Sequence, residues 1–163
     1  MSKKVAHYGI FASLAILMGY VEAVFPIPLP VPGLKLGFSN VIVLLALCIM
    51  GAKDAFGISA IRVLISALLF KGFLGFWYSL AGAILSFAVM AIALKSSKLS
   101  IIGVSVLGGV SHNIGQILVA WIILGRATVI YLIPILMVCG ALTGFGIGIV
   151  VKYCRAHIDK KVI

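Results

Sequence analysis

Residues 101–124 read IIGVSVLGGVSHNIGQILVAWIIL and contain no Asp, Glu, Lys or Arg. A helix needs about 20 mostly apolar residues to cross the hydrocarbon core of a bilayer, so this run is long enough to span a membrane. The run is apolar on all sides, whereas the strands of a membrane barrel alternate apolar and polar residues. The stretch therefore predicts a transmembrane α-helix.

The composition extends this prediction to the rest of the chain. Of the 163 residues, 64% are hydrophobic and 10% are charged, and the mean hydropathy is +1.32. A soluble domain is close to half apolar and about a quarter charged. Lipid must therefore cover much of this protein, and we expect an all-α polytopic membrane protein with a single membrane domain over residues 1–163.

Further apolar runs give six predicted spans in all. They lie at about 6–25, 36–51, 55–71, 75–94, 101–124 and 129–151. The second and third are short, so we expect them inside the bundle or flanked by residues that snorkel to the membrane surface. The link 26–35 holds four prolines and cannot be helical.

The distribution of Lys and Arg predicts the topology. With six spans, nine cations fall on the side of the two chain ends, three fall on the other side, and Arg62 lies within a span. By the positive-inside rule, both ends lie in the cytoplasm and the 26–35 link faces outward from the cell membrane. The net charge of +10 is explained by this topology and a basic tail at the lipid surface, so we expect no nucleic-acid partner.

A few polar residues fall inside the predicted spans. A buried cation such as Arg62 costs roughly 3 kcal/mol or more and needs a partner. Glu22 is the one acid expected in the outer half, and Lys35 lies at the outer mouth of the second span. Two cations and one acid favour an anionic ligand. An internal Arg62–Glu22 pair, with Lys35 snorkelling, explains the same residues.

The fifth span carries the second polar group. His112, Asn113 and Gln116 are spaced to share, or nearly share, one helix face. Their groups must form hydrogen bonds at that depth, either to other helices or to a ligand, and Asn40 is a further member of this set. Trp77 and Tyr78 fit an interfacial aromatic belt, and they could also stack on a planar ligand.

Small residues recur at three- and four-residue steps on two spans, which lets helix backbones approach closely. On the last span, Gly140, Gly144 and Gly148 favour internal packing. On the first span, packing competes with docking of a partner protein. The residues of this docking surface would be Ala12, Ala15, Gly19 and Ala23.

Several catalytic patterns are missing from the sequence. It has no GxxxxGK[ST] motif for ATP and no aspartate cluster for the magnesium of a diphosphate substrate. His112 has no acid or nucleophile beside it in the sequence, and the cysteines lack metal-binding spacing. We therefore expect no catalytic residue, metal or cofactor of its own, and we do not expect an enzyme.

Four stretches resemble one known family. They are GLKLGFSN at 33–40, IRVLISALLF at 61–70, SLAGAILS at 79–86 and SHNIGQILVA at 111–120. In this order they are similar to the Gx transporter family, which is also labelled heptaprenyl diphosphate synthase component I. The resemblance covers about residues 6–151.

The first label implies the membrane substrate-binding (S) component of an energy-coupling factor (ECF) transporter. Such a component works with a transmembrane coupling subunit and cytoplasmic ATPases. The resemblance implies docking through the first helix, where Ala15-x-x-x-Gly19-x-x-x-Ala23 replaces the usual Ala-x-x-x-Ala. It also implies a vitamin-like ligand, best a flavin (riboflavin, FMN or FAD). The candidate ligand-binding residues are Lys35, Asn40, Arg62, Trp77, Tyr78, His112, Asn113 and Gln116.

The second label implies a membrane subunit associated with heptaprenyl diphosphate synthesis. A third class of function is a structural factor for a membrane redox complex. The missing acidic metal ligands favour the transporter component over synthase chemistry.

Overall fold

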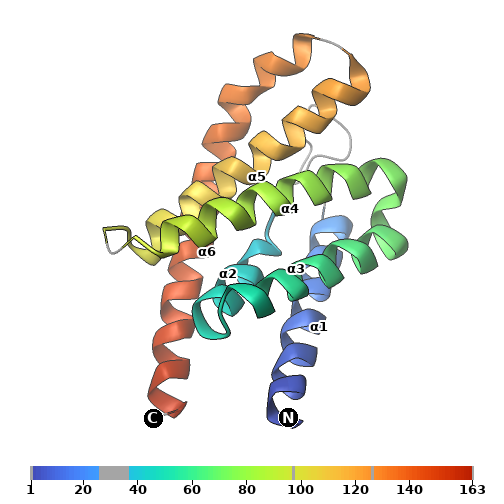
Figure 1. Ribbon diagram of the computed structural model, residues 1–163. Coiled ribbons are helices and arrows are strands. Elements are labelled where there is room, and N and C mark those ends of the chain that lie inside the picture. The colour runs from blue at the N-terminus through green and yellow to red at the C-terminus, as the bar shows by residue number, and fades with distance from the viewer. Residues whose placement is uncertain (1, 26–36, 97, 126, 163) are drawn as a thin grey trace.

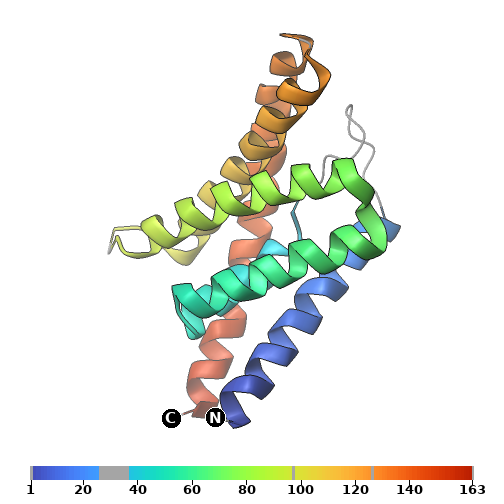
Figure 2. The same ribbon diagram turned by 45° about the vertical axis from the view of Figure 1, so that its right-hand side comes forward.

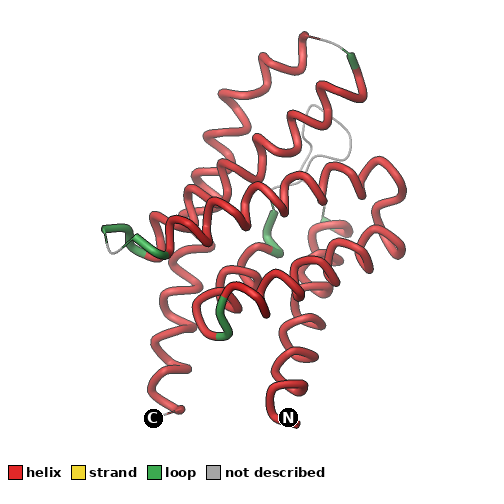
Figure 3. Tube along the Cα trace, in the orientation of Figure 1, coloured by secondary structure: helices red, strands yellow, loops and turns green. Residues whose placement is uncertain are grey.

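The computed structural model describes residues 2–25, 37–96, 98–125 and 127–162. Every regular element in these ranges is a helix (Figure 3), which confirms the predicted all-α fold class. In chain order (Figure 1), the elements are α1 (Ser2–Val24), α2 (Asn40–Ile49), α3 (Ala52–Ser66), the π-helix η1 (Ala67–Lys71), α4 (Gly72–Leu94), α5 (Ile101–Leu124), the 3-10 helix η2 (Ala127–Leu132) and α6 (Ile133–Val162).

Helix α5 has the bounds that the sequence predicts, and both of its ends carry local stop signals. The Ser100 hydroxyl accepts a hydrogen bond from the Gly103 N–H at 3.1 Å, which caps the first turn. Gly125 ends the helix with a φ of 60°, a left-handed conformation that glycine adopts without steric cost.

The other predicted spans differ from the helices at their ends. The predicted span 36–51 becomes the much shorter α2, which begins at Asn40. The predicted span 55–71 is divided between α3 and the π-helix η1. Helix α6 begins later than predicted, after η2, and continues to Val162.

Four of the described helices are long and apolar enough to cross a membrane, judged by length and composition. They are α1, α4, α5 and α6. Helix α2 has 10 residues and is therefore about 15 Å long, half of a hydrocarbon core of roughly 30 Å. The four long helices thus indicate a membrane protein. The start of α2 lies inside the bundle, because Ser39 and Asn40 are buried.

Glycines bring α5 close to its two neighbours. A methyl group added at Gly140 on α6 would lie 2.7 Å from the Gly109 carbonyl oxygen on α5. One added at Gly115 on α5 would lie 2.7 Å from the Ala81 carbonyl oxygen on α4. Gly144 and Gly148 make similar close approaches to α5. The prediction that the glycines of the last span serve internal packing is therefore confirmed.

The remaining helices pack around this three-helix unit. Helix α3 runs antiparallel to α4, to which η1 joins it (Figure 2), whereas α4 itself packs mainly against α5. Helix α2 contacts α3 and α6, and α1 lies along α3. Large apolar side chains such as Ile92, Ile122 and Leu142 remain exposed on the outside, where lipid would cover them.

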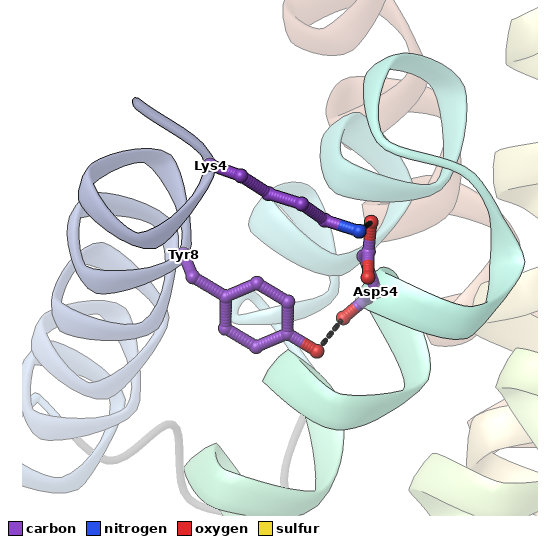
Figure 4. Close-up of polar contacts among 3 residues, drawn as sticks. All are labelled: Lys4, Tyr8 and Asp54. Atoms are coloured by element: carbon purple, nitrogen blue, oxygen red, sulfur yellow. Dashed lines mark hydrogen bonds and ion pairs between the residues drawn. The ribbon is translucent and has the colours of Figure 1, made fainter. Parts of the chain in front are cut away.

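The two ends of the chain lie at the same end of the molecule (Figures 1 and 2). There α1 is fixed to the first turn of α3 (Figure 4). The Lys4 ammonium lies 2.9 Å from the Asp54 carboxylate, and the Tyr8 hydroxyl donates a hydrogen bond of 2.8 Å to the Asp54 carbonyl.

Candidate functional site

Buried polar side chains gather around the turn that leads into α2. We call this group the polar cluster; each member is at most 6% exposed. Its members are Glu22, Ser39, Asn40, Arg62, Ser66, Ser86, His112 and Gln116. They come from α1, the turn 37–40, α3, α4 and α5. Polar groups so deep in an apolar protein must find hydrogen-bonding partners.

The carboxylate of Glu22 binds the backbone at the start of α2. Its Oε1 accepts the Gly37 N–H at 2.6 Å and the Phe38 N–H at 3.4 Å. Backbone donors at a helix N-terminus have no partner within the helix, and the helix dipole favours negative charge there. Glu22 on α1 therefore fixes the entrance to α2.

Arg62 contacts the same turn from α3. Its Nη1 donates a hydrogen bond to the Ser39 hydroxyl. Its charge is attracted to that of Glu22, although the two side chains form no direct salt bridge in the described part of the chain. The Nε of Arg62 and the Ser66 hydroxyl, one turn further along α3, have no hydrogen-bond partner among the described residues. Arg62 thus keeps a donor available inside the protein.

His112 and Gln116 lie on the other side of the turn. The His112 Nε2 and the Gln116 Nε2 are 2.7 Å apart, one turn apart on α5. The imidazole fits between two glycines: a methyl group at Gly37 would lie 3.0 Å from its Cδ2, and one at Gly82 would lie 2.7 Å from its Cε1. Asn40 completes the group by donating to the Ser86 hydroxyl at 3.4 Å.

The structure thus brings together four of the residues predicted to bind a ligand. Asn40, Arg62, His112 and Gln116 all belong to the polar cluster. Asn113 instead faces α6, where its Nδ2 donates to the Leu136 carbonyl at 2.6 Å. Its Oδ1 has no partner among the described residues.

The three remaining predicted ligand-binding residues are not placed in the polar cluster. Lys35 lies outside the described residues. Tyr78 is buried in an apolar group with residues such as Ile117 and Ala120. Trp77 is 42% exposed, and its ring contacts Phe73 and Phe76 on the same helix. Their stacking on a ligand stays a prediction.

Two of the four residues predicted to dock a partner lie inside the bundle. Ala15 is 0% exposed, and a methyl group added at Gly19 would lie 3.0 Å from the Ser66 Oγ. Ala12 and Ala23 are partly buried. The structure therefore gives Ala15 and Gly19 a role in packing within this chain, and a docking role for the face stays a prediction.

The sequence alone did not reveal some members of the site. The sequence suggests Glu22 as a partner for Arg62, whereas in the structure it accepts backbone N–H groups. The sequence does not mark Ser39 or Ser86 as members of the site. One local signal was available: Ser39 and Asn40 directly precede an apolar run, a pattern typical of a helix N-terminus. Nothing local indicates that Gly37 lies against His112.

Together these features define a helical membrane protein with a buried polar centre between its helices. The chain belongs to the heptaprenyl diphosphate synthase component I family, because the model of that family matches residues 11–154. The match confirms the family indicated by the four sequence stretches. No curated protein and no solved structure matches the chain significantly.

The two carboxylates whose side chains the structure describes hold parts of the chain together. The sequence has three acidic residues. Glu22 binds the entrance to α2, and Asp54 pairs with Lys4. Within the described ranges, no group of three or more His, Cys, Asp or Glu side chains is arranged to hold a metal ion. The polar cluster offers hydrogen-bond donors, amides and an imidazole, which suit recognition of a small polar molecule.

Proposed function

We propose that this chain is the membrane substrate-binding component of an ECF-type transporter. In this proposal α2 and α3, with their flanking residues, complete six spans, and both chain ends lie on the cytoplasmic side of the cell membrane. The observation that carries the proposal is the polar cluster, which gathers groups from four helices and one turn inside an apolar bundle. Such groups are costly in a membrane, and where they occur they often mark a ligand site or a transport pathway.

The ligand that fits best is a small vitamin-like molecule, and a flavin is our leading candidate. A flavin ring has amide-like edges that can pair with Asn40, Gln116 and His112. A phosphate or another acceptor oxygen would suit the Nε of Arg62, which has no partner among the described residues. The positive charges of Arg62 and Lys35 would attract a negatively charged ligand. The negative charge of Glu22 would offset part of the charge of Arg62.

Transport driven by ATP would need partner subunits. The sequence lacks a P-loop of its own, so the energy would come from cytoplasmic ATPases through a transmembrane coupling subunit. The partly buried Ala12 and Ala23 on α1 remain candidates for that contact. In this proposal the chain itself is not an enzyme.

The family name favours a second candidate. It is a membrane subunit associated with heptaprenyl diphosphate synthesis, the role that the family name describes. The engagement of Glu22 and Asp54 in helix packing argues against catalysis by this chain, so any synthase role would be to anchor or assist a catalytic partner. A passive structural factor for a membrane redox complex is the third candidate.

One experiment separates these functions. The tagged chain is co-expressed with candidate coupling and ATPase subunits, and copurification, riboflavin uptake and prenyl elongation are all measured. The transporter component predicts a stable complex and uptake that Gln116→Leu reduces, while Leu118→Ala, on the exposed side of the same helix, has no effect. Prenyl elongation that depends on the chain, without an associated ATPase, would favour the synthase subunit. A structural factor would show neither activity.

A further inference from the structure

The turn that leads into α2 is fixed from two sides. Glu22 accepts its Gly37 and Phe38 N–H groups, and Arg62 binds the hydroxyl of Ser39. Ser39 occupies the N-cap position of α2, yet its side chain makes no capping hydrogen bond. Glu22 instead holds, from α1, the two backbone N–H groups that directly precede the N-cap position.

The same turn lies directly against His112. A methyl group at Gly37 would be 3.0 Å from the His112 Cδ2 and 3.2 Å from its Nε2. This Nε2 is the atom that contacts Gln116. Gly37 has a φ of 80°, in the region that side chains other than glycine rarely adopt. The backbone of the turn therefore covers the contact between His112 and Gln116.

We propose that Glu22 is a positioning residue for the polar cluster: its hydrogen bonds hold the turn 37–38 over His112 and Gln116, and breaking them uncovers this pair. That a ligand binds the uncovered pair rests on the proposed function. That the turn covers His112 is independent of the proposed function, because it follows from contacts within the chain. Hydrogen bonds to a carboxylate are among the stronger ones in proteins, so the loss of Glu22 should have a measurable effect.

Chemical modification of histidine measures this covering directly. Diethyl pyrocarbonate reacts with accessible imidazoles, and the exposed His157 on α6 is an internal control. The full-length chain in lipid nanodiscs is treated, and the rate at each histidine is read by peptide mass spectrometry. In the unaltered protein we expect His157 to react and His112 to be protected. Glu22→Ala should speed the reaction of His112 by about tenfold or more, a factor that corresponds to ~1.4 kcal/mol, with His157 unchanged.

Two further variants separate positioning from general loosening of the structure. Glu22→Gln keeps an acceptor oxygen and should preserve most of the protection of His112. Ser39→Ala removes the acceptor of Arg62 but leaves the Glu22 hydrogen bonds intact, so it should leave His112 protected. If Glu22→Ala does not fold, Gly37→Ala replaces it: a side chain strains the positive φ of Gly37 and its methyl group would press on His112 at 3.0 Å, so the turn should fit less closely and expose His112.

The proposal is overturned if folded Glu22→Ala protects His112 as well as the unaltered protein does. If Glu22→Ala does not fold, the same result with Gly37→Ala overturns it. It is also overturned if Ser39→Ala exposes His112 as strongly as Glu22→Ala. Riboflavin serves as the ligand probe. Protection of His112 by riboflavin in Glu22→Ala would support the ligand role, whereas its absence, with the Glu22 effect intact, would count against the proposed function alone.

Discussion

The close contact between α5 and α6 can be tested with a pair of glycines on α6. A methyl group at Gly144 would lie 2.6 Å from the Ser105 carbonyl oxygen and 2.8 Å from the Val106 Cα. Both are backbone atoms of α5, so the two helices would have to move apart. At Gly146 the same methyl group would meet nothing within 4 Å. Overpacking of this kind costs about 1–3 kcal/mol, whereas a helical Gly→Ala change alone gains up to about 1 kcal/mol.

We therefore expect Gly144→Ala to lower the free energy of unfolding by up to about 2 kcal/mol, which is the cost of overpacking less the gain in helix propensity. Gly146→Ala should leave it unchanged or raise it slightly. Reversible unfolding in mixed micelles, with helix content followed by circular dichroism, measures both variants under the same conditions. Equal stability of the two variants would refute the packing of α5 against α6 described above.

Other parts of the structure give further predictions. Arg62→Ala should destabilise the fold by about 1–3 kcal/mol, because it removes a buried hydrogen bond, and adding Glu22→Gln should recover part of this loss; a double variant no more stable than the single one would contradict the attraction between the two charges. Gly19→Leu should lower thermal stability, because its side chain would collide with Ser66; a normal melting temperature combined with lost assembly would instead identify Gly19 as a docking residue. A cysteine at Pro30 should react with an impermeant reagent in intact cells, and labelling only after permeabilisation would reverse the predicted topology.

Local sequence signals predict that the long helices exist, and they predict the bounds of α5. The bounds of α5 follow from an uninterrupted apolar run between Ser100 and Gly125, each of which acts on its own helix end. Helix α2 is different, because its entrance is fixed by Glu22, which is 15 residues away from Gly37 in the chain. A predicted start at residue 36 could not take this contact into account. The π-helix η1 also has no sequence signal that we can identify.

The site shows the same division between local and distant effects. The four-residue step between His112 and Gln116 correctly predicts that they share a helix face, and their side chains lie in contact. Arg62 and Asn40 fall within predicted spans, and the structure shows both of them buried. The sequence could not show that Asn113 points to α6 or that Ala15 is covered by neighbouring helices, because both depend on how the helices pack.

The central claim is that the polar cluster binds a small vitamin-like molecule. Native mass spectrometry of the purified chain, combined with its visible absorption spectrum, tests this most directly. We predict that the chain carries a ligand with the mass and absorption of a flavin. Arg62→Ala should weaken its binding by about 1.5–3 kcal/mol, the contribution of a hydrogen bond to a charged group. A folded chain that carries no ligand and binds no added flavin, or a folded Arg62→Ala protein with full affinity, would contradict the claim.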